Sequence, residues 1–228
     1  MFNLFSENGI ILNSTQQEKL LKFKELLIFY NSQFNLTSIK TDEEVFIKHF
    51  YDSLYGIKYF DKNKTVVEIG SGGGFPSIPI MIARDDLKFT LIESTGKKCE
   101  YLKKVIKELN LNATVLNIRA EDGGKNNLYR EKFDYCTARA VARLNTLLEY
   151  CLPFIKVGGS FIAYKGEAEE EISECDNALK VLGGKINITE KYNLPLNMGK
   201  RTIFVINKES NTPIKYPRGN GKERSKPL

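Results

Sequence analysis

The chain has few of the residues from which metal, redox and hydrolytic sites are built. Its 228 residues include one histidine, four cysteines and no tryptophan. The cysteines, Cys99, Cys136, Cys151 and Cys175, lie far apart without a C-x-x-C pair. This spacing excludes zinc ribbons and fingers, and we expect no metal site. The single histidine, His49, is interpreted as a packed or capping residue on a helix, because no multi-histidine site can be built from it.

Segments that would direct the chain out of the cytoplasm are also missing. The sequence begins MFNLFSENGI, with Glu7 where a signal peptide carries Lys or Arg before a continuous apolar run. No later segment is apolar over the length that spans a membrane. We therefore expect a reduced, soluble, cytoplasmic protein without a membrane partner.

Charge is concentrated at one end of the chain. Lys and Arg total 34 and Asp and Glu total 28, which gives a formal net charge of +6 at pH 7. Between Lys215 and Leu228, five basic residues stand against the single acidic residue Glu223, so +4 of the +6 lies in this tail. A positive field favours an anionic partner. Composition does not decide the oligomeric state, and a monomer is the simplest expectation.

The first part of the chain is predicted to be helical. Ser14 and Gln17 match a capping box, and apolar residues recur at helical spacing up to residue 30. Thr41 with Glu44 opens a second helix. Since a domain has about 150 residues, this length makes one domain with appendages. We divide the chain into an N-terminal helical extension (1–60), a main domain (61–210) and a basic tail (211–228).

The middle of the chain alternates between two periodicities. Apolar runs predict strands at Thr65–Ile69, Phe89–Ile92, Thr114–Ile118, Phe133–Thr137 and Ser160–Tyr164. Helices are predicted at Pro76–Arg84, Cys99–Leu109, Leu144–Cys151 and Glu167–Leu182. This order predicts an α/β fold with a mostly parallel sheet. The last two strands, Ile186–Tyr192 and Thr202–Asn207, are joined by an eight-residue loop, which is too short for a parallel crossover and predicts an antiparallel pair.

A glycine-rich turn follows the first predicted strand and reads EIGSGGGFP over residues 68–76. Glycines let a backbone approach a bound molecule, and open α/β sheets bind ligands at the carboxyl ends of their strands. The alternative is a tight turn without a ligand. A dinucleotide fingerprint counted from Gly70 needs glycine where Phe75 stands. E-x-G-x-G-x-G instead matches the first motif of class I (Rossmann-like) methyltransferases, whose cofactor S-adenosylmethionine carries cationic groups that suit Glu68.

Acidic residues follow the next two predicted strands. Glu93 stands about 20 residues after the glycine turn, the offset at which an acid accepts ribose hydroxyls. A helix cap or a surface charge is the alternative. Arg119, Ala120, Glu121 and Asp122 come where the chain would pass an adenine ring, and an acidic loop that begins the next helix is an equal alternative.

The segment after the fourth predicted strand excludes two reaction classes. It reads TARA over residues 137–140, without the N-P-P-[YF] clamp of amino-group methyltransferases or the Pro-Cys nucleophile of cytosine-C5 methyltransferases. Cys136 and Cys151 lack a general base at readable spacing. We interpret them as buried small hydrophobic residues.

Blocks spread over nearly the whole chain resemble a known family. They read NLT at 35–37, HFYDSL at 49–54, EIGSGGGFPSIP at 68–79, LIESTGK at 91–97, RAE at 119–121, TARA at 137–140 and YKG at 164–166, followed by the basic tail. Together they resemble the bacterial small-subunit ribosomal RNA guanine-N7 methyltransferases, also called glucose-inhibited division protein B. The most specific blocks are G-F-P-x-I-P and N-L-T with H-x-x-D-S-L.

The resemblance implies an S-adenosylmethionine-dependent methyltransferase domain over residues 61–210. The cofactor residues it implies are Gly70, Gly72, Gly74, Phe75, Glu93, Ser94, Thr95, Ala120, Glu121 and Arg139. The residues it implies for RNA are Arg119, Arg139, Lys165, Arg201 and Arg218. The implied partner is 16S ribosomal RNA in the small subunit or in an assembly intermediate. Glu223 replaces a second proline that is usual in the family, which puts the rigidity of the tail in doubt.

The implied chemistry needs no catalytic acid or base. Guanine N7 carries a lone pair and no proton, so its attack on the sulfonium methyl group depends on proximity and alignment. The major groove of A-form RNA is too narrow for a side chain, so the target base should be splayed from a loop or reached in an open intermediate.

Three other functions stay open from the sequence. The chain could be a methyltransferase for a small molecule or a protein, a non-enzymatic RNA-binding protein, or a nicotinamide dehydrogenase. Salt-sensitive RNA binding, cofactor binding and the nucleotide that stabilises the protein separate them. We expect the tail, stiffened by Pro217 and Pro227, to dock RNA, so that deleting Lys215–Leu228 weakens RNA binding and leaves cofactor affinity unchanged. The alternative is a disordered solubilising end.

Overall fold

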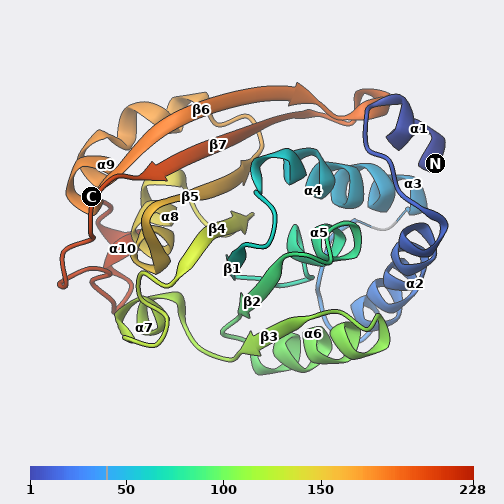
Figure 1. Ribbon diagram of the computed structural model, residues 1–228, viewed down its shortest axis with the longest axis horizontal. Helices are drawn as coiled ribbons and strands as arrows, with labels where there is room; N and C mark the ends of the chain where they lie inside the picture. Colours follow the sequence, from blue (N-terminus) through green and yellow to red (C-terminus); the bar gives the residue numbers. More distant parts are fainter. Residues whose placement is uncertain (40) are drawn as a thin grey trace.

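A seven-stranded sheet forms the centre of the computed structural model, which describes residues 1–39 and 41–228 (Figure 1). The strands are β1 (Thr65–Ile69), β2 (Lys88–Ile92), β3 (Ala113–Leu116), β4 (Phe133–Arg139), β5 (Ile155–Lys165), β6 (Gly184–Asn193) and β7 (Lys200–Lys208). Their order is β3-β2-β1-β4-β5-β7-β6. The first five strands pair in parallel, and β7 runs antiparallel to both β5 and β6. The predicted α/β class with an antiparallel pair at one end is confirmed.

Helices surround this sheet. They are α1 (Phe2–Glu7), α2 (Ser14–Asn31), α3 (Asp42–Glu44), α4 (Asp52–Tyr55), α5 (Ser77–Ala83), α6 (Gly96–Glu108), α7 (Ala120–Lys125), α8 (Leu144–Cys151), α9 (Asp176–Leu182) and α10 (Lys222–Ser225). A π-helical segment, Val45–Tyr51, joins α3 to α4. Shorter 3₁₀ turns span Gly56–Tyr59, Leu152–Phe154, Glu169–Glu174 and Pro195–Asn197. No helix of the described ranges is both long and apolar enough to cross a membrane.

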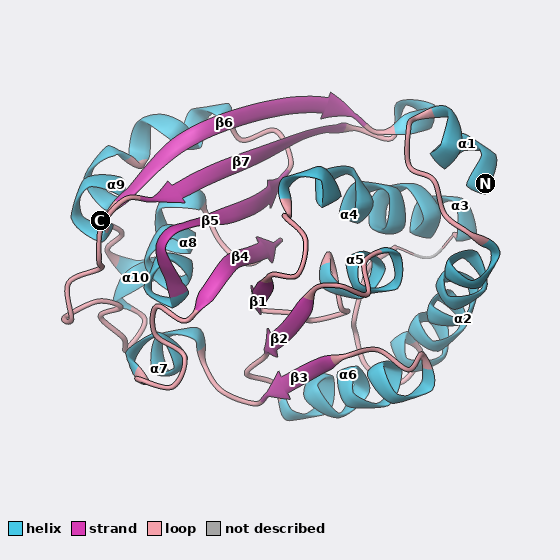
Figure 2. Ribbon diagram, in the orientation of Figure 1, coloured by secondary structure: helices cyan, strands magenta, loops and turns pink. Residues whose placement is uncertain are grey.

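The helices cover the two faces of the sheet as separate layers (Figures 1 and 2). Helices α2, α4, α5 and α6 lie on one side, where Phe5, Phe23 and Leu27 of the N-terminal region share a core with Val66 and Leu91 of the sheet. Helices α7 to α10 lie toward the other side, over a second core that includes most of α8. The N-terminal helices therefore fold onto the sheet. The division at residues 60 and 210 stays a prediction.

The start of α2 differs from the prediction by one residue. The capping box is formed by Asn13 and Gln16, each side chain accepting a 2.9 Å hydrogen bond from the backbone N–H of the other. The predicted pair of Ser14 and Gln17 is wrong, because an asparagine caps as well as a serine and stands one position earlier. The second predicted start is confirmed, since the Thr41 hydroxyl accepts from the Glu44 N–H at 3.2 Å.

The predicted helix over residues 167–182 is also wrong in part. Its first half is the 3₁₀ turn Glu169–Glu174, and the α-helix begins only at Asp176. Tertiary contacts hold Glu171 away from a regular helix, because its carboxylate accepts from the Leu144 N–H at 2.6 Å and pairs with Lys165 at 2.9 Å. This acidic segment therefore anchors the start of α8.

The sheet places its ligand-binding edge between β1 and β4. From β1 the chain proceeds through β2 and β3 in one direction, and from β4 through β5 in the other. Open α/β sheets bind ligands outside the carboxyl ends of the strands at this change of direction. The glycine turn after β1 and the segment after β4 meet there.

Candidate functional site

The glycine turn is packed on two sides and open in the middle. A Cβ atom on Gly70 would lie 2.7 Å from a methyl carbon of Val141, and one on Gly74 would lie 2.5 Å from Ile78. Gly72 has φ +49°, and a Cβ there would meet only the Gly70 carbonyl oxygen, at 3.7 Å. Packing therefore leaves no room for a side chain at Gly70 or Gly74, whereas Gly72 faces open space.

Glu68 lies beneath this turn as a buried carboxylate. Its exposed fraction is 0%, and among the residues described Ser71 and Ser77 offer its oxygens only hydrogen bonds that fall short of ordinary geometry. Burial raises the pKa of Glu68 from 4.5 to about 7, against smaller lowering effects of Ser71, Ser77 and the charge of Arg139. A buried carboxylate with little compensation favours a nearby cation.

Glu93, at the end of β2, ties the turn to the next helix. One carboxylate oxygen accepts from the Gly72 N–H at 3.0 Å and the other from the Thr95 N–H at 2.7 Å. Thr95 is the N-cap residue of α6. Each carboxylate oxygen can accept a second hydrogen bond, so Glu93 keeps capacity for a ligand hydroxyl.

A cavity of about 760 Å³ opens beside the turn, along the carboxyl ends of β1 to β3. Five residues predicted for cofactor or RNA line it: Gly70, Ser94, Arg119, Ala120 and Glu121. Its other walls include Val141, Tyr150 of α8 and the C-terminal residues Gly219, Asn220, Gly221 and Arg224. The Arg119–Asp122 segment is the start of α7, as the alternative interpretation expected, and it also lines this cavity. We call this space the first cavity.

A second cavity of about 280 Å³ lies at the ends of β4 and β5. It brings together three predicted RNA residues, Arg139, Lys165 and Arg201. Arg139, predicted for both cofactor and RNA, therefore lies here. The remaining predicted cofactor residues, Gly72, Gly74, Phe75, Glu93 and Thr95, belong to the turn and the strand end that support the first cavity.

Arg139 is held by a network from the N-terminal helices. Its guanidinium donates to Asp52 at 2.8 Å, to the Lys48 carbonyl oxygen at 3.0 Å and to His49 Nδ1 at 2.6 Å. The guanidinium also lies 5.0 Å from the ring centre of Phe75. Phe75 in turn stacks on His49 at 4.1 Å. The glycine turn and the second cavity are thus joined through aromatic stacking.

His49 is a neutral positioning residue in this network. Burial first, and then the charges of Arg139 and Arg201, lower the pKa of His49 from 6.5 to about 2. Because Nδ1 accepts from Arg139, the network assigns the ring proton to Nε2, which donates to the Thr37 hydroxyl at 2.8 Å. The interpretation of His49 as a packed histidine is confirmed.

Asp52 is the carboxylate on which the second cavity depends. It is 3% exposed and accepts from the Tyr192 hydroxyl at 2.6 Å, and its carboxylate lies 3.6 Å from Arg201. Lys165 has a separate anchor, since it pairs with Glu171 and donates to the Ala142 carbonyl oxygen at 2.9 Å. Fixed carboxylates therefore hold all three of the predicted RNA residues at the cavity.

Arg218, the fifth residue predicted for RNA, lies elsewhere. Its guanidinium pairs with buried Glu149 of α8, with the shortest nitrogen–oxygen distance at 2.7 Å. Cys136 and Cys151 are buried, as predicted. The described tail packs on the rest of the chain, because Tyr216 and Glu223 are buried and Arg218 pairs with Glu149. The alternative of a disordered end is therefore wrong.

Several residues that line or support the two cavities were not among the site residues predicted from the sequence. His49 and Asp52 are three positions apart, and this helical spacing places both on one face. Glu149 stands in an otherwise mostly apolar helix, where a carboxylate needs a cationic partner. Both signals were present in the sequence. The cavity positions of Val141 and Tyr150 carried no local signal.

Comparison with known proteins places these features in one family. A family model described as rRNA small subunit methyltransferase G matches residues 16–196. The ribosomal RNA small subunit methyltransferase G of Brevibacillus brevis is 46% identical over 229 residues, which covers 99% of this chain and 96% of that protein. The protein of the same name from Acetivibrio thermocellus is 45% identical over 222 residues, with 96% and 92% covered.

Solved structures with low sequence identity share the fold. TYW2 of Pyrococcus horikoshii in complex with MeSAdo has a TM-score of 0.57 at 14% identity, over 74% of this chain and 64% of that one. The fibrillarin pre-rRNA processing protein of Methanococcus jannaschii has a TM-score of 0.53 at 17% identity, over 66% and 69%. The Rossmann-like methyltransferase fold, predicted from the glycine motif together with the order of strands and helices, is thereby confirmed.

Proposed function

Because the chain belongs to the rRNA small subunit methyltransferase G family, we propose that it transfers a methyl group from S-adenosylmethionine to N7 of a guanine in 16S ribosomal RNA. The observation that carries this proposal is the adjacency of the two cavities. Residues 139–141 divide them, since Arg139 and Ala140 line the second cavity and Val141 lines the first. A cofactor in one cavity and a base in the other would meet at the glycine turn.

The residues around the first cavity fit S-adenosylmethionine. Glu68, beneath the turn, offers a buried carboxylate that Ser71 and Ser77 only partly compensate, and Gly72 leaves open space above the turn. When bound, the cofactor supplies an electrophilic methyl group on a sulfonium cation. Gly70, Ser94, Ala120 and Glu121 would line its site, with Glu93 available to a ribose hydroxyl. A pyrophosphate beside Glu68 would be repelled, which argues against a nicotinamide cofactor.

The second cavity supplies what guanine recognition requires. Arginine can donate to the O6 acceptor of guanine while it leaves the N7 lone pair free to attack, and Arg139 and Arg201 both line this space. The attacking nitrogen needs no base, in agreement with a neutral His49 whose two ring nitrogens are both engaged. The protein's contribution is therefore to hold base and cofactor in line, through the anchored position of Arg139.

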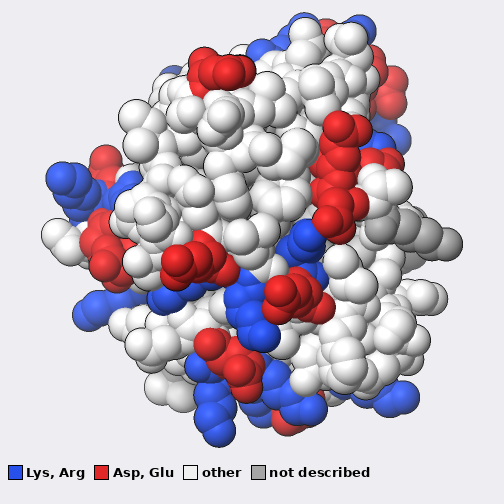
Figure 3. Space-filling view, turned by 90° about the vertical axis from the view of Figure 1, so that its right-hand side faces the viewer, with Lys and Arg blue, Asp and Glu red and all other residues white. Residues whose placement is uncertain are grey.

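The partner would be 16S ribosomal RNA in the small subunit or in an assembly intermediate, met in the cytoplasm by a monomer. The face on the side of α1 to α3 interleaves basic and acidic groups around a broad uncharged area (Figure 3). Phosphate contacts on that face would be offset by neighbouring carboxylates. We propose RNA contacts instead for the predicted residues that line the two cavities, Arg119, Arg139, Lys165 and Arg201.

Methyl transfer from labelled S-adenosylmethionine tests this function directly. Intact small subunits, RNA extracted from them and a free transcript should be compared as substrates, with N7-methylguanine identified by nuclease digestion and chromatography. We expect label at one guanine, and Arg139→Lys should reduce transfer because one ammonium cannot replace a planar guanidinium fork. Label on a protein or a small molecule, with none on RNA, would refute the proposal in favour of the other methyltransferase class.

A further inference from the structure

The C-terminal tail forms part of the first cavity. After β7 the chain returns past α7, and α10 lies beside α8 on the left of Figure 1. Gly219, Asn220, Gly221 and Arg224 line the same space as Ala120 and Glu121 of α7. A segment about a hundred residues away in sequence thus closes the cavity opposite the position predicted for adenine.

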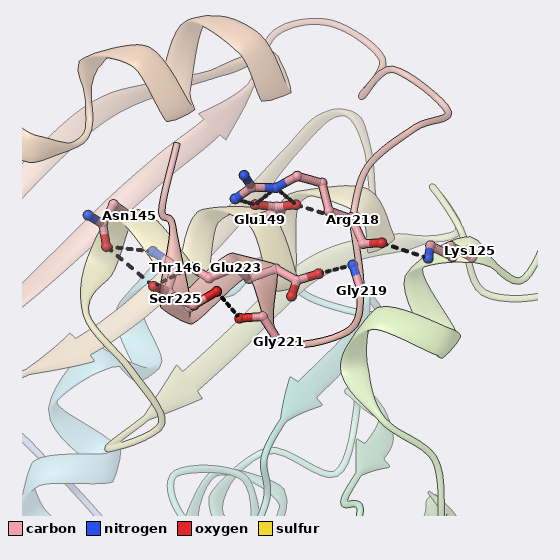
Figure 4. Close-up of polar contacts among 9 residues, drawn as sticks. All are labelled: Lys125, Asn145, Thr146, Glu149, Arg218, Gly219, Gly221, Glu223 and Ser225. Carbon is pink, nitrogen blue, oxygen red and sulfur yellow. Dashed lines mark hydrogen bonds and ion pairs between the residues drawn. The ribbon is translucent and has the colours of Figure 1, made fainter.

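A buried ion pair fixes the beginning of this segment (Figure 4). The Glu149 side chain is 1% exposed, and its carboxylate accepts from Arg218 Nε at 2.9 Å, from Arg218 Nη2 at 2.7 Å and from the Arg218 backbone N–H at 2.8 Å. Lys125 of α7 donates to the Arg218 carbonyl oxygen at 3.1 Å. Detaching Arg218 would leave the Glu149 charge buried without a partner, so this pair opposes any movement of the start of the tail.

A second carboxylate shapes the turn that faces the cavity. The Glu223 side chain accepts from the Gly219 N–H, and its backbone carbonyl accepts from the Thr146 hydroxyl at 3.0 Å (Figure 4). Arg224 donates to the Val141 carbonyl oxygen at 3.1 Å, on the loop that divides the two cavities. Both ends of the turn are therefore tied to α8 or to the walls of the site.

We propose that Gly219–Arg224 is a wall of the adenosine end of the S-adenosylmethionine site, and that Glu149 is a positioning residue that holds this wall through Arg218. The inference rests on the proposed cofactor. The sequence predicted that deleting the basic tail leaves cofactor affinity unchanged. Under this proposal, deleting the tail should instead lower cofactor affinity. Arg224 lines the cavity and would contact the ligand. Arg218 does not line the cavity and would act by holding the wall in position.

Point variants of the full chain test this proposal. Arg218→Ala should detach the wall. If the wall is then in place in about one molecule in ten, the apparent Kd for S-adenosylmethionine should rise about tenfold. Arg218→Lys should restore part of the affinity, because it keeps a charge for Glu149. Arg224→Ala should weaken binding by removing a side chain that lines the cavity and its hydrogen bond to Val141, while the pair of Arg218 and Glu149 still holds the start of the tail. Lys222→Ala is the matched control, since this exposed residue lies on the same short helix without lining the cavity.

Adenosine, used as a competing ligand, locates the effect. Arg218→Ala and Arg224→Ala should weaken adenosine and S-adenosylmethionine by the same factor, whereas Glu68→Gln should weaken only S-adenosylmethionine. In wild-type protein, either ligand should slow amide hydrogen exchange in residues 219–224. Folded Arg218→Ala and Arg224→Ala proteins with wild-type affinity for both ligands would overturn the proposal. Wild-type protein that binds adenosine but not S-adenosylmethionine would instead refute the proposed function.

Discussion

The Glu68→Gln substitution separates two effects of the buried carboxylate, its cost to the stability of the fold and its contribution to cofactor binding. Burial raises the Glu68 pKa from 4.5 to about 7, and at 1.36 kcal/mol for each pKa unit this corresponds to about 3 kcal/mol. Because the pKa is higher in the folded state, the folded protein binds the proton more tightly. This stabilisation is complete below about pH 4.5 and is lost as the pH rises through about 7. Glutamine, which does not ionise, avoids the loss.

Urea unfolding of both proteins measures the effect. The difference in unfolding free energy between variant and wild type should move in favour of the variant by about 2–3 kcal/mol between about pH 5 and about pH 8. Other titrating groups are shared by the two proteins and cancel in the difference. A difference that stays constant with pH would refute the assignment of a raised pKa to Glu68.

Bound cofactor should reverse the preference of the folded protein for a protonated Glu68. A cation beside Glu68 favours the ionised carboxylate, so binding of S-adenosylmethionine below about pH 7 should release a proton. Calorimetry in two buffers with different ionisation enthalpies counts that proton. Affinity in the wild type should rise with pH up to about 7, by at most about tenfold for each pH unit. The Glu68→Gln protein should bind more weakly and without the proton; equal proton release in both proteins would place the linked group elsewhere.

Three further substitutions test the two cavities. Gly72→Val should abolish S-adenosylmethionine binding in calorimetry while costing about 1–2 kcal/mol of stability, because φ is +49° there; a folded variant with unchanged affinity would exclude Gly72 from the site. Glu93→Gln should weaken cofactor binding by about 1–3 kcal/mol and leave RNA affinity unchanged, whereas a fall in RNA affinity would assign Glu93 to another surface. Asp52→Asn should lower methyl transfer more than S-adenosylmethionine affinity, because Arg139 and Arg201 lose their shared carboxylate; equal losses in both assays would contradict that separation.

Elements with a strong local signal were predicted well from the sequence. Thr65–Ile69 and Leu144–Cys151 have the predicted limits, because an apolar run bounded by polar residues defines a strand or a buried helix on its own. Glu171 shows where this fails. Its segment has the composition of a helix, but its carboxylate contacts Leu144 and Lys165 from a distant part of the chain.

The same distinction holds within the site. The glycine turn and the acids at the strand ends are local features, and their positions followed from one rule about parallel sheets. The support of Arg139 by His49 and Asp52 depends on how the N-terminal helices pack on the sheet. Such support comes from residues about 90 positions away in sequence, so periodicity could not reveal it.

The basic tail shows why a count of charges does not measure a surface for RNA. Five basic residues are present there, but Arg218 is neutralised by Glu149 at 2.7 Å and Arg224 is turned toward the first cavity. Lys215, Lys222 and Lys226 are exposed and could contact phosphates. Each phosphate contact contributes about 0.7–0.9 to the magnitude of the slope of log affinity against log salt. Three exposed lysines can therefore supply a slope of about 2 to 3, whereas the five basic residues of the tail would supply about 3.5 to 4.5. RNA docking by the tail stays a prediction, and the measured slope tests how many of its basic residues contact phosphates.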